Sequence, residues 1–339
     1  MNNLKPVLVI VTLILLVTLI VPALLVLPFS SSDEKGELDE KISSKINSLS
    51  SLNDSMEISV YRTQKDVVES LPIEQYVIGV VSGEMPADFE SEALKAQALA
   101  ARTYIVQQLT NSDKTGLPEG ADVTDTVNHQ VYKNQAELKL QWGKDFQWKI
   151  DKITQAVADT KGQIITYNEV PITATFFSTS NGQTENSEAY WAEEIPYLRS
   201  VESPWDTQSP KFESQKIITL ADFQQKLGIK LPGDGSVGVI TSRTPGDRVG
   251  IVKIGDNEFT GREVRDKLGL NSSDFTWVRK SDHIVINTKG YGHGVGMSQY
   301  GANGMAKEGK SYEDIVLHYY HDVQIVSADN LLTAYVSQN

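Results

Sequence analysis

The chain has 339 residues, enough for one large domain or two, and its formal net charge at pH 7 is −13. This acidic balance argues against a nucleic-acid ligand, because neutralising phosphates requires many lysine and arginine side chains. The sequence contains no cysteine, which excludes disulfides, thiolate metal ligands and cysteine nucleophiles.

The N-terminal part predicts a membrane attachment. Residues 7–29 are uncharged and long enough to span a bilayer as a helix, and this run is too long for a signal peptide. Lys5 and the amino terminus favour a cytoplasmic tail over residues 1–6 and a body outside the cell membrane. Residues 30–56 are polar and serine-rich, which predicts a flexible stalk. The folded body then occupies residues 57–339.

Two helices are predicted on either side of a short corner that contains Glu84. The first covers residues 71–83, with apolar residues on one face, and Gly83 is expected to end it. The second covers residues 91–109, is rich in alanine and leucine, and has Ser91 as its expected N-cap. Glu84 is therefore held between two packed helices, either as a solvated turn residue or as a working acid.

The rest of the body mixes hairpins with short helices. The fold class is therefore predicted as α+β: a single extracytoplasmic domain with a helical core around this corner and antiparallel β-hairpins, preceded by one transmembrane helix. Hairpins are expected at residues 162–180 and 236–260, short helices at 220–228 and 261–269, and strands at 283–290 and 322–328.

Lys95 and Arg102 lie seven residues apart on the second predicted helix, so both point to the same side of it. One interpretation is a solvated stripe of charge. The other is a basic pair beside Glu84 that holds a carboxylate of a substrate or orients the acid.

The segment KGYGHGVGMSQYGANG, residues 289–304, has glycine at every second position over part of its length. Glycine in a strand marks a bulge or a close approach by a ligand or another backbone. The spacing fits neither a P-loop nor a dinucleotide fingerprint, which disfavours nucleotide binding. His293 is compatible with a structural role, but with Gln299 and Tyr300 nearby we expect this segment to line a groove.

Residues 178–181 place hydroxyl and amide groups at a strand end, with Tyr190 and Trp191 shortly after them. Such a combination suits a sugar, whose ring face stacks on aromatic side chains while its edges form hydrogen bonds. A polar loop with a packed tryptophan is the equally open alternative.

Four motifs in order, VVSGEMP, EALKAQALAARTY, FFSTSNGQTE with its following YW and YLRSVESPWD, and GYGHGVGMSQYGA, closely resemble the stage II sporulation protein D family. The resemblance covers residues 57–327 and the anchor. It implies a membrane-anchored peptidoglycan lytic transglycosylase of endospore-forming bacteria, placed in the septal membrane of the mother cell and facing the forespore. Such an enzyme cleaves the MurNAc–GlcNAc bond of peptide-stripped glycan strands, leaves a 1,6-anhydro end, and works with a peptidoglycan amidase during engulfment.

The resemblance also implies roles for individual residues. The catalytic glutamate of the family corresponds to Glu84, and no cofactor is expected. Some relatives bind zinc through cysteine and histidine in a segment that here reads DVTDTVNHQVYKN. Without cysteine we expect no metal there, and Asp122, Asp125 and His129 are expected only to hold the loop. Groove residues of the family correspond to Lys95, Arg102, Ser178, Tyr197, His293, Gln299 and Tyr300.

One carboxyl group is enough for this reaction. Protonated Glu84 would donate to the glycosidic oxygen, and its carboxylate would then accept the proton of the MurNAc C6 hydroxyl as that oxygen closes on C1. The acid needs burial to raise its pKa toward neutrality. The alternatives are a non-catalytic glycan-binding module that activates an amidase, and a scaffold that holds a membrane complex together.

Overall fold

The computed structural model describes residues 56–111, 115–329 and 331–333, all of which belong to one compact unit. The predicted tail, the anchor and all but the last residue of the stalk lie outside the described residues. Within the described ranges, none of the helices has the length and apolar character needed to span a bilayer. The described part is a mixed α+β fold with several small sheets, most of them antiparallel.

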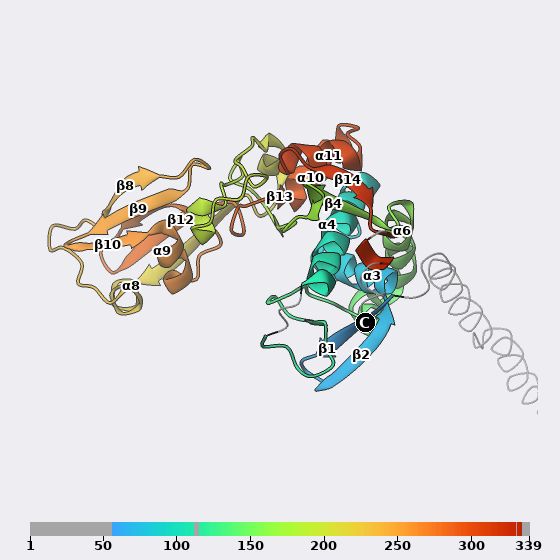
Figure 1. Cartoon of the computed structure of the whole chain (residues 1–339). Coiled ribbons are helices and arrows are strands. Elements are labelled where there is room, and N and C mark those ends of the chain that lie inside the picture. Colours follow the sequence, from blue (N-terminus) through green and yellow to red (C-terminus); the bar gives the residue numbers. More distant parts are fainter. Residues whose placement is uncertain (1–55, 112–114, 330, 334–339) are drawn as a thin grey trace, which may run out of the picture. The chain divides into compact units, whose positions relative to one another are not determined.

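Helix α4 (Ser91–Thr110) forms the centre of a helical core (Figure 1). Its alanines let other elements approach closely, and Ala93, Ala96 and Ala100 have no exposed surface. Glu90, and not Ser91 as expected, occupies the N-cap position. Helix α4 contacts four helices, α3 (Ile73–Glu84), α6 (Phe146–Asp159), α10 (Gln299–Lys307) and α11 (Tyr312–Tyr319), and the strands β4 (Gln163–Tyr167) and β5 (Val170–Pro171).

Helix α3 continues past Gly83, which sequence analysis expected to end it, and stops at Glu84 because Met85 is extended. Gly79 and Gly83 instead allow a close approach. A Cβ atom at Gly79 would lie 2.3 Å from the Tyr132 ring, and one at Gly83 would lie 2.9 Å from the Val131 carbonyl oxygen. The two glycines therefore let residues 131–133 pack directly on the helix.

Three small sheets flank these helices. The hairpin predicted at residues 162–180 is present in its first part, where β4 pairs antiparallel with β5. Residues 176–177 instead pair in parallel with residues 297–298. The sheets have the strand orders β2-β1-β3, β14-β4-β5 and β13-β6. Their strands are β1 (Glu57–Arg62), β2 (Val67–Pro72), β3 (Val123–Thr124), β5 (Val170–Pro171), β6 (Phe176–Phe177), β13 (Met297–Ser298) and β14 (Gln324–Ser327). The shorter helices are α5 (Gln135–Trp142) and α7 (Glu188–Trp191), with a 3-10 turn η2 (Gly143–Asp145) and a 3-10 helix η3 (Pro204–Gln208).

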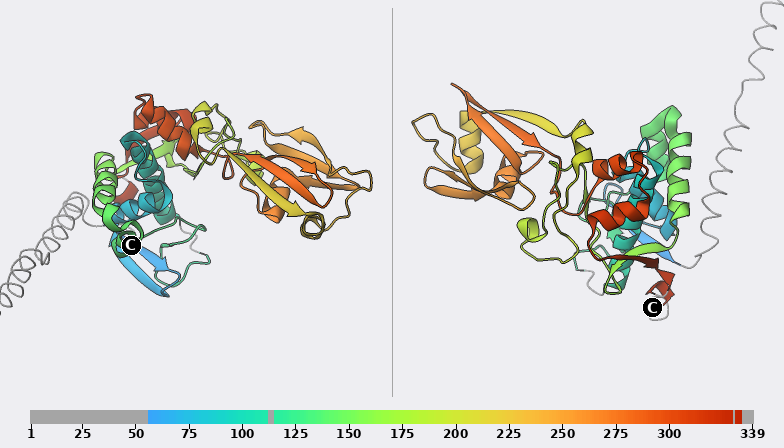
Figure 2. Two further views of the ribbon diagram at one scale, coloured as in Figure 1. Left: turned by 180° about the vertical axis from the view of Figure 1, so that it is seen from behind. Right: turned by 90° about the horizontal axis from the view of Figure 1, so that it is seen from above.

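Residues 213–289 form a β-rich segment that we call the inserted lobe. The chain enters and leaves it at neighbouring points, since the Gly290 amide donates to the Phe212 carbonyl oxygen at 2.7 Å. Its two sheets have the orders β11-β12-β7 and β10-β9-β8, and its strands appear yellow to orange in Figure 2. The strands are β7 (Glu213–Thr219), β8 (Val239–Arg243), β9 (Val249–Ile254), β10 (Asn257–Thr260), β11 (Asp274–Arg279) and β12 (His283–Lys289).

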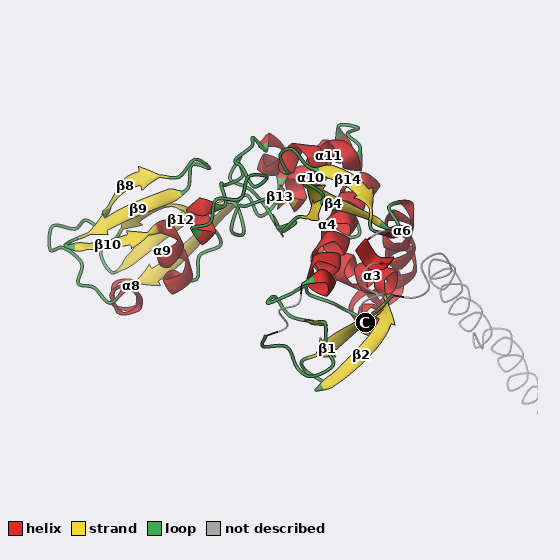
Figure 3. Ribbon diagram, in the orientation of Figure 1, coloured by secondary structure: helices red, strands yellow, loops and turns green. Residues whose placement is uncertain are grey.

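The inserted lobe has a hydrophobic core of its own, which sequence analysis did not anticipate. Helices α8 (Leu220–Leu227) and α9 (Gly261–Leu268) contribute buried Phe223 and Val264 to it, and both sheets supply aliphatic side chains. Figure 3 shows both helices beside the yellow strands. Each helix ends at a glycine in the left-handed region, which confirms both predicted helices and their ends.

Candidate active site

Glu84 is the last residue of α3, and the fold fixes its backbone from two sides. The Met85 amide donates to the Val81 carbonyl at 3.0 Å and closes the helix, while Gln299 Nε2 donates to the Glu84 carbonyl at 3.0 Å. The carboxyl group accepts a hydrogen bond from the Val131 amide, with an N–Oε1 distance of 3.1 Å. Glu84 therefore occupies a defined position at the corner between α3 and α4.

The surroundings of Glu84 favour its protonated form. Burial raises the pKa of the Glu84 carboxyl above its ordinary value, and the hydrogen bond from Val131 opposes this only in part. The side chain is partly buried and forms no ion pair with any residue of the described ranges. The carboxyl-terminal end of a helix also disfavours a negative charge. Glu84 thus has the electrostatics of a proton donor.

The loop that carries Val131 is held by a buried cluster of charge. Arg62, which is 3% exposed, donates to Asp125 at 3.0 Å and also pairs with Glu69 and Glu137. The Ser59 amide donates to Asp122 at 3.0 Å. These contacts fix residues 122–133 against α3 and so present the Val131 amide to Glu84.

The same loop corresponds to the segment that binds zinc in some relatives of the family that the sequence resembles, and in which no metal was expected here. His129 Nδ1 lies 2.9 Å from the Thr124 hydroxyl, a contact within the loop, and Asp125 is engaged by Arg62. The described residues contain no group of three or more His, Cys, Asp or Glu side chains arranged around a common metal position. Asp122, Asp125 and His129 thus make the loop-holding contacts predicted for them.

Three predicted groove residues lie together with Glu84 around a pocket of about 370 Å³: Ser178, Gln299 and Tyr300. Gln299 also donates to Gln97 at 3.3 Å, which joins the start of α10 to α4. The Tyr300 amide donates to the Ser178 carbonyl at 3.0 Å, so the strand end and the helix start form one wall. The Tyr300 ring packs edge-on against Phe89.

Further residues line this pocket that sequence analysis did not identify. Trp142 closes one side as the last residue of α5, and Lys149 follows on α6. Lys211 reaches the Ser178 hydroxyl at 3.4 Å, and its ammonium group lies 5.0 Å from the centre of the Tyr291 ring. No motif or spacing distinguishes these residues in the sequence, because only tertiary packing brings them to Glu84.

Lys95 and Arg102 do face the same side of α4, as their spacing predicted, but that side packs against the end of α6. Lys95 pairs with Asp159 at 3.1 Å and with Glu92 at 2.8 Å. Arg102 is 1% exposed and donates through two nitrogens to Glu74, at 2.9 and 2.7 Å. Neither residue lines the pocket around Glu84. Their contacts are those of residues that hold the helical core together.

Tyr197 and His293 also lie away from this pocket. The Tyr197 hydroxyl accepts a hydrogen bond from the Thr173 amide at 2.9 Å. The His293 ring packs among three aromatic rings, those of Phe177, Tyr190 and Trp191. Burial, together with Arg265 and Arg248, lowers the pKa of His293 to about 4, so its imidazole is neutral at pH 7.

The segment expected to line a groove does so through Gln299 and Tyr300, while its alternating glycines pack against the protein itself. Gly290, Gly292, Gly294 and Gly296 all have positive φ angles between 81° and 118°. A Cβ atom at Gly296 would lie 2.2 Å from the Thr175 carbonyl oxygen, and the other three would meet protein atoms within 2.9 Å. The glycines therefore allow this segment to pack against neighbouring chain.

Comparison with known proteins identifies the family. Stage II sporulation protein D of Bacillus subtilis (strain 168) is 52% identical over 326 residues, covering 94% of this chain and 95% of the relative. This chain belongs to the stage II sporulation protein D family. The protein of the same name from Bacillus amyloliquefaciens is 48% identical, covering 98% of this chain and 99% of that relative. The family profile described as SpoIID: Stage II sporulation protein matches residues 61–167, which include Glu84 and the loop that contacts it.

A more distant relative has a different name. The amidase enhancer of Bacillus subtilis (strain 168) is 28% identical, and the alignment covers 74% of this chain but 40% of the relative. Membership of the stage II sporulation protein D family agrees with the resemblance drawn from the four sequence motifs.

Proposed function

We propose that this protein is a peptidoglycan lytic transglycosylase in which Glu84 is both the acid and the base. The observation that carries the proposal is a carboxyl group of raised pKa that lines a pocket without a cationic partner. Trp142 and Tyr300 line the same pocket with aromatic side chains, a residue type on which sugar rings stack. Ser178, Gln141 and Lys211 supply polar groups suited to sugar hydroxyls and carbonyls.

The reaction follows from one carboxyl group. Glu84 in its acid form protonates the glycosidic oxygen as the bond between that oxygen and MurNAc C1 breaks. The resulting carboxylate removes the proton from the MurNAc C6 hydroxyl, whose oxygen bonds to C1 and forms the 1,6-anhydro ring. Glycosidases that hydrolyse this type of bond generally use two carboxyl groups. Here the C6 hydroxyl replaces the nucleophile, so the second carboxyl group is not needed.

The family supports a biological setting. The proposed substrate is the septal peptidoglycan of a sporulating cell, whose strands an amidase has stripped of peptides before engulfment. The anchor predicted over residues 7–29 would hold the body on the outer face of the mother-cell septal membrane, facing the forespore.

The decisive experiment replaces the Glu84 carboxyl group with an amide of the same shape, which cannot act as an acid. We expect Glu84→Gln to lower the rate of glycan cleavage by at least about 10²-fold, since general acid–base catalysis contributes 10²–10⁴-fold. Purified full-length protein is incubated with peptide-free glycan strands, without an amidase, and products with anhydro ends are measured by mass spectrometry. Glu119→Gln is the matched control, because Glu119 is exposed and lies outside this pocket. Continued release of anhydro products by the Gln variant would refute the role of Glu84.

A second function is favoured by the similarity to the amidase enhancer: a glycan-binding body that activates an amidase without cleaving glycan itself. The Glu84→Gln variant separates the two functions. If activation is the function, the variant should stimulate release of stem peptides from intact peptidoglycan as well as the wild type does, and the wild type should yield no anhydro ends.

A further inference from the structure

The β11-β12-β7 sheet in the inserted lobe has one face that lies away from the hydrophobic core. This face is polar at the end where Glu213 and Lys289 lie, and apolar farther along the strands, where Ile217 and Val278 are exposed. The register aligns side chains across the three strands in rows. Thr276, Asn287 and Gln215 form one row, and all three are exposed. Asp274, Lys289 and Glu213 form the next row. Side chains two residues apart on a strand share a face, so the two rows form one continuous surface.

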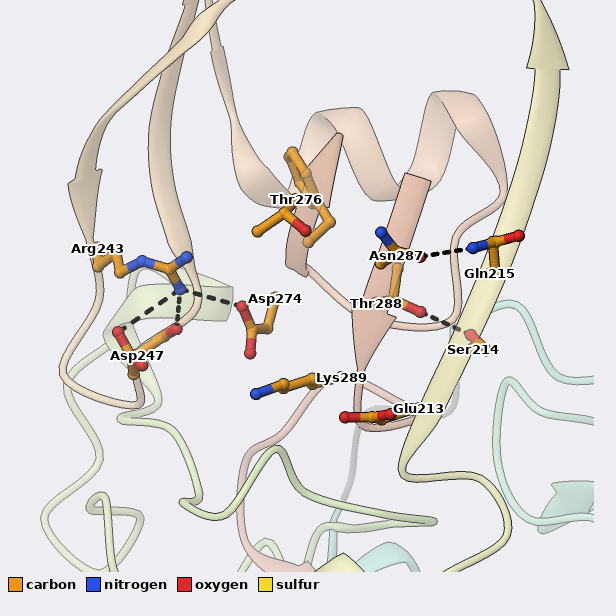
Figure 4. Close-up of a pocket in the computed structure, with 11 residues that line it drawn as sticks. Glu213, Ser214, Gln215, Arg243, Asp247, Asp274, Thr276, Asn287, Thr288 and Lys289 are labelled. Atoms are coloured by element: carbon orange, nitrogen blue, oxygen red, sulfur yellow. Dashed lines mark hydrogen bonds and ion pairs between the residues drawn. The ribbon is translucent and has the colours of Figure 1, made fainter. Parts of the chain in front are cut away.

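This surface forms the floor of a pocket of about 560 Å³, larger than the pocket at Glu84 (Figure 4). The hairpin of β8 and β9 contributes Arg243 and Asp247 to it. Arg243 pairs with Asp274 at 3.0 Å and with Asp247 at 3.5 Å. Figure 4 shows this charged group on one side and the Gln215–Asn287 pair on the other.

Two charges in the pocket have no partner among the residues that the structure describes. Lys289 and Glu213 are exposed cross-strand neighbours, yet neither side chain forms a hydrogen bond or an ion pair with any described residue. An unpaired ammonium group and an unpaired carboxylate in one pocket suit a ligand that also carries both charges.

The amide row offers a complementary neutral contact. Gln215 Nε2 donates to Asn287 Oδ1 at 2.9 Å, which leaves the Gln215 carbonyl oxygen and the Asn287 amino group without a partner in the described chain. One free acceptor beside one free donor matches the N–H and C=O of a peptide bond.

A sugar is the less suitable ligand. Phe275 is the only aromatic side chain among the residues that line this pocket, and it is 1% exposed, so it presents no ring face. The pocket at Glu84, in contrast, is lined by Trp142 and Tyr300. The two pockets therefore differ in chemistry: aromatic side chains line the one at Glu84, whereas the one on the inserted lobe presents charges and paired amides but no aromatic ring.

We propose that the pocket on the inserted lobe binds a short peptide that carries both a free amine and a free carboxylate. Its ammonium group would lie near Glu213, its carboxylate near Lys289, and a backbone amide over Gln215 and Asn287. If the proposed function is right, the source of such a peptide is the stem peptide of peptidoglycan. The protein would then contact the wall at two sites, one for glycan and one for peptide.

The test measures binding of a synthetic stem tetrapeptide with free termini to full-length protein by isothermal titration calorimetry. We expect saturable binding, weakened at least tenfold by Lys289→Gln and by Glu213→Gln. Lys253→Gln and Glu258→Gln are matched controls, because these residues are also an exposed cross-strand pair in the same lobe but lie outside the pocket. They should leave the affinity unchanged.

Two further probes define the ligand. The same peptide with its amine acetylated and its carboxylates amidated should bind at least tenfold more weakly, and peptide-free glycan should not compete. Tighter binding of the natural D-containing peptide than of its all-L isomer would point to the wall as the source, and equal binding would support any peptide of this charge pattern.

The proposal is overturned if the tetrapeptide does not bind, if the pocket variants bind as well as the control variants, or if glycan displaces the peptide. Glu84→Gln should bind the tetrapeptide as the wild type does. Failure of this proposal thus leaves glycan cleavage at Glu84 untouched, and loss of cleavage leaves peptide binding measurable.

Discussion

Glu74 and Glu84 lie at opposite ends of α3, about 15 Å apart along an axis that rises 1.5 Å per residue. Glu74 is 4% exposed in the first turn, where the positive end of the helix favours a carboxylate. It receives two hydrogen bonds from Arg102. Glu84 is in the last turn, where a carboxylate is disfavoured, and its carboxyl group receives one hydrogen bond, from the neutral Val131 amide.

The difference shows how one helix can carry a structural carboxylate and a second one that we propose to be reactive. Pairing with a guanidinium favours the charged form, whereas burial without a cation favours the protonated form. Position on a helix therefore does not by itself decide whether a carboxyl group is charged or protonated. The partner of the carboxyl group also decides, and for each glutamate that partner comes from a distant part of the chain.

The largest effect is expected when the structural end is broken. Arg102→Ala leaves the buried Glu74 carboxylate without its cation, which should lower the free energy of unfolding by about 3–5 kcal/mol. Lys95→Ala is the matched change on the same side of α4. Its ion pairs are partly exposed, so the loss should be about 1 kcal/mol or less. Urea unfolding of both variants, followed by tryptophan fluorescence, measures the difference.

A substrate-binding role for Arg102 would give the opposite pattern. In that case Arg102→Ala would unfold at the same urea concentration as the wild type and would bind glycan more weakly. The ion pair between Arg102 and Glu74 would then not stabilise the fold.

The next effect concerns the pocket at the reactive end. Trp142→Ala removes an aromatic side chain from the pocket, and we expect kcat/KM for glycan cleavage to fall about 10- to 30-fold, or about 1–2 kcal/mol. Trp148→Ala is the control, because Trp148 is 43% exposed on α6 and does not line the pocket. Equal kinetics for the two variants would show that Trp142 does not contact the glycan.

The short helices and the hairpins could be predicted because neighbouring residues determine them. Apolar spacing and terminal glycines were sufficient for α8 and α9, and alternating residues with a turn were sufficient for the hairpins. Glu84 stood out because a charge follows an apolar helical run. The inserted lobe and its own hydrophobic core were not predicted, because its first and last strands pair residues far apart in the sequence, as in Glu213 with Lys289.

The candidate site was predicted only in part, for a related reason. A cation such as Arg102 has the same appearance in a sequence whether it binds a ligand or a buried carboxylate, and its partner Glu74 precedes it by 28 residues. Trp142 and Lys211 carry no local signal at all, since the fold alone places them beside Glu84. Residue type and spacing predicted the acid, but the partners of each charge required the structure.

The smallest effect concerns the stability of the reactive end and its dependence on pH. Burial raises the pKa of Glu84 above its value in the unfolded chain, so the folded state holds this proton more tightly. The resulting stability is fully present below the unfolded pKa and is lost as pH rises through the folded pKa. At pH 7 the wild type therefore carries the cost of holding a carboxylate in a partly buried position, which lowers its free energy of unfolding.

Glu84→Gln removes that cost and retains an oxygen that accepts the Val131 hydrogen bond. The variant should therefore be more stable than the wild type at pH 7, and the difference should shrink as pH falls toward and below the ordinary glutamate pKa of 4.5. Urea unfolding at a series of pH values tests this, with Glu119→Gln as the exposed control that should show no such trend. A Gln variant less stable than the wild type at pH 7 would mean that the protein stabilises the Glu84 anion, and an acid that prefers to be ionised could not protonate a glycosidic oxygen.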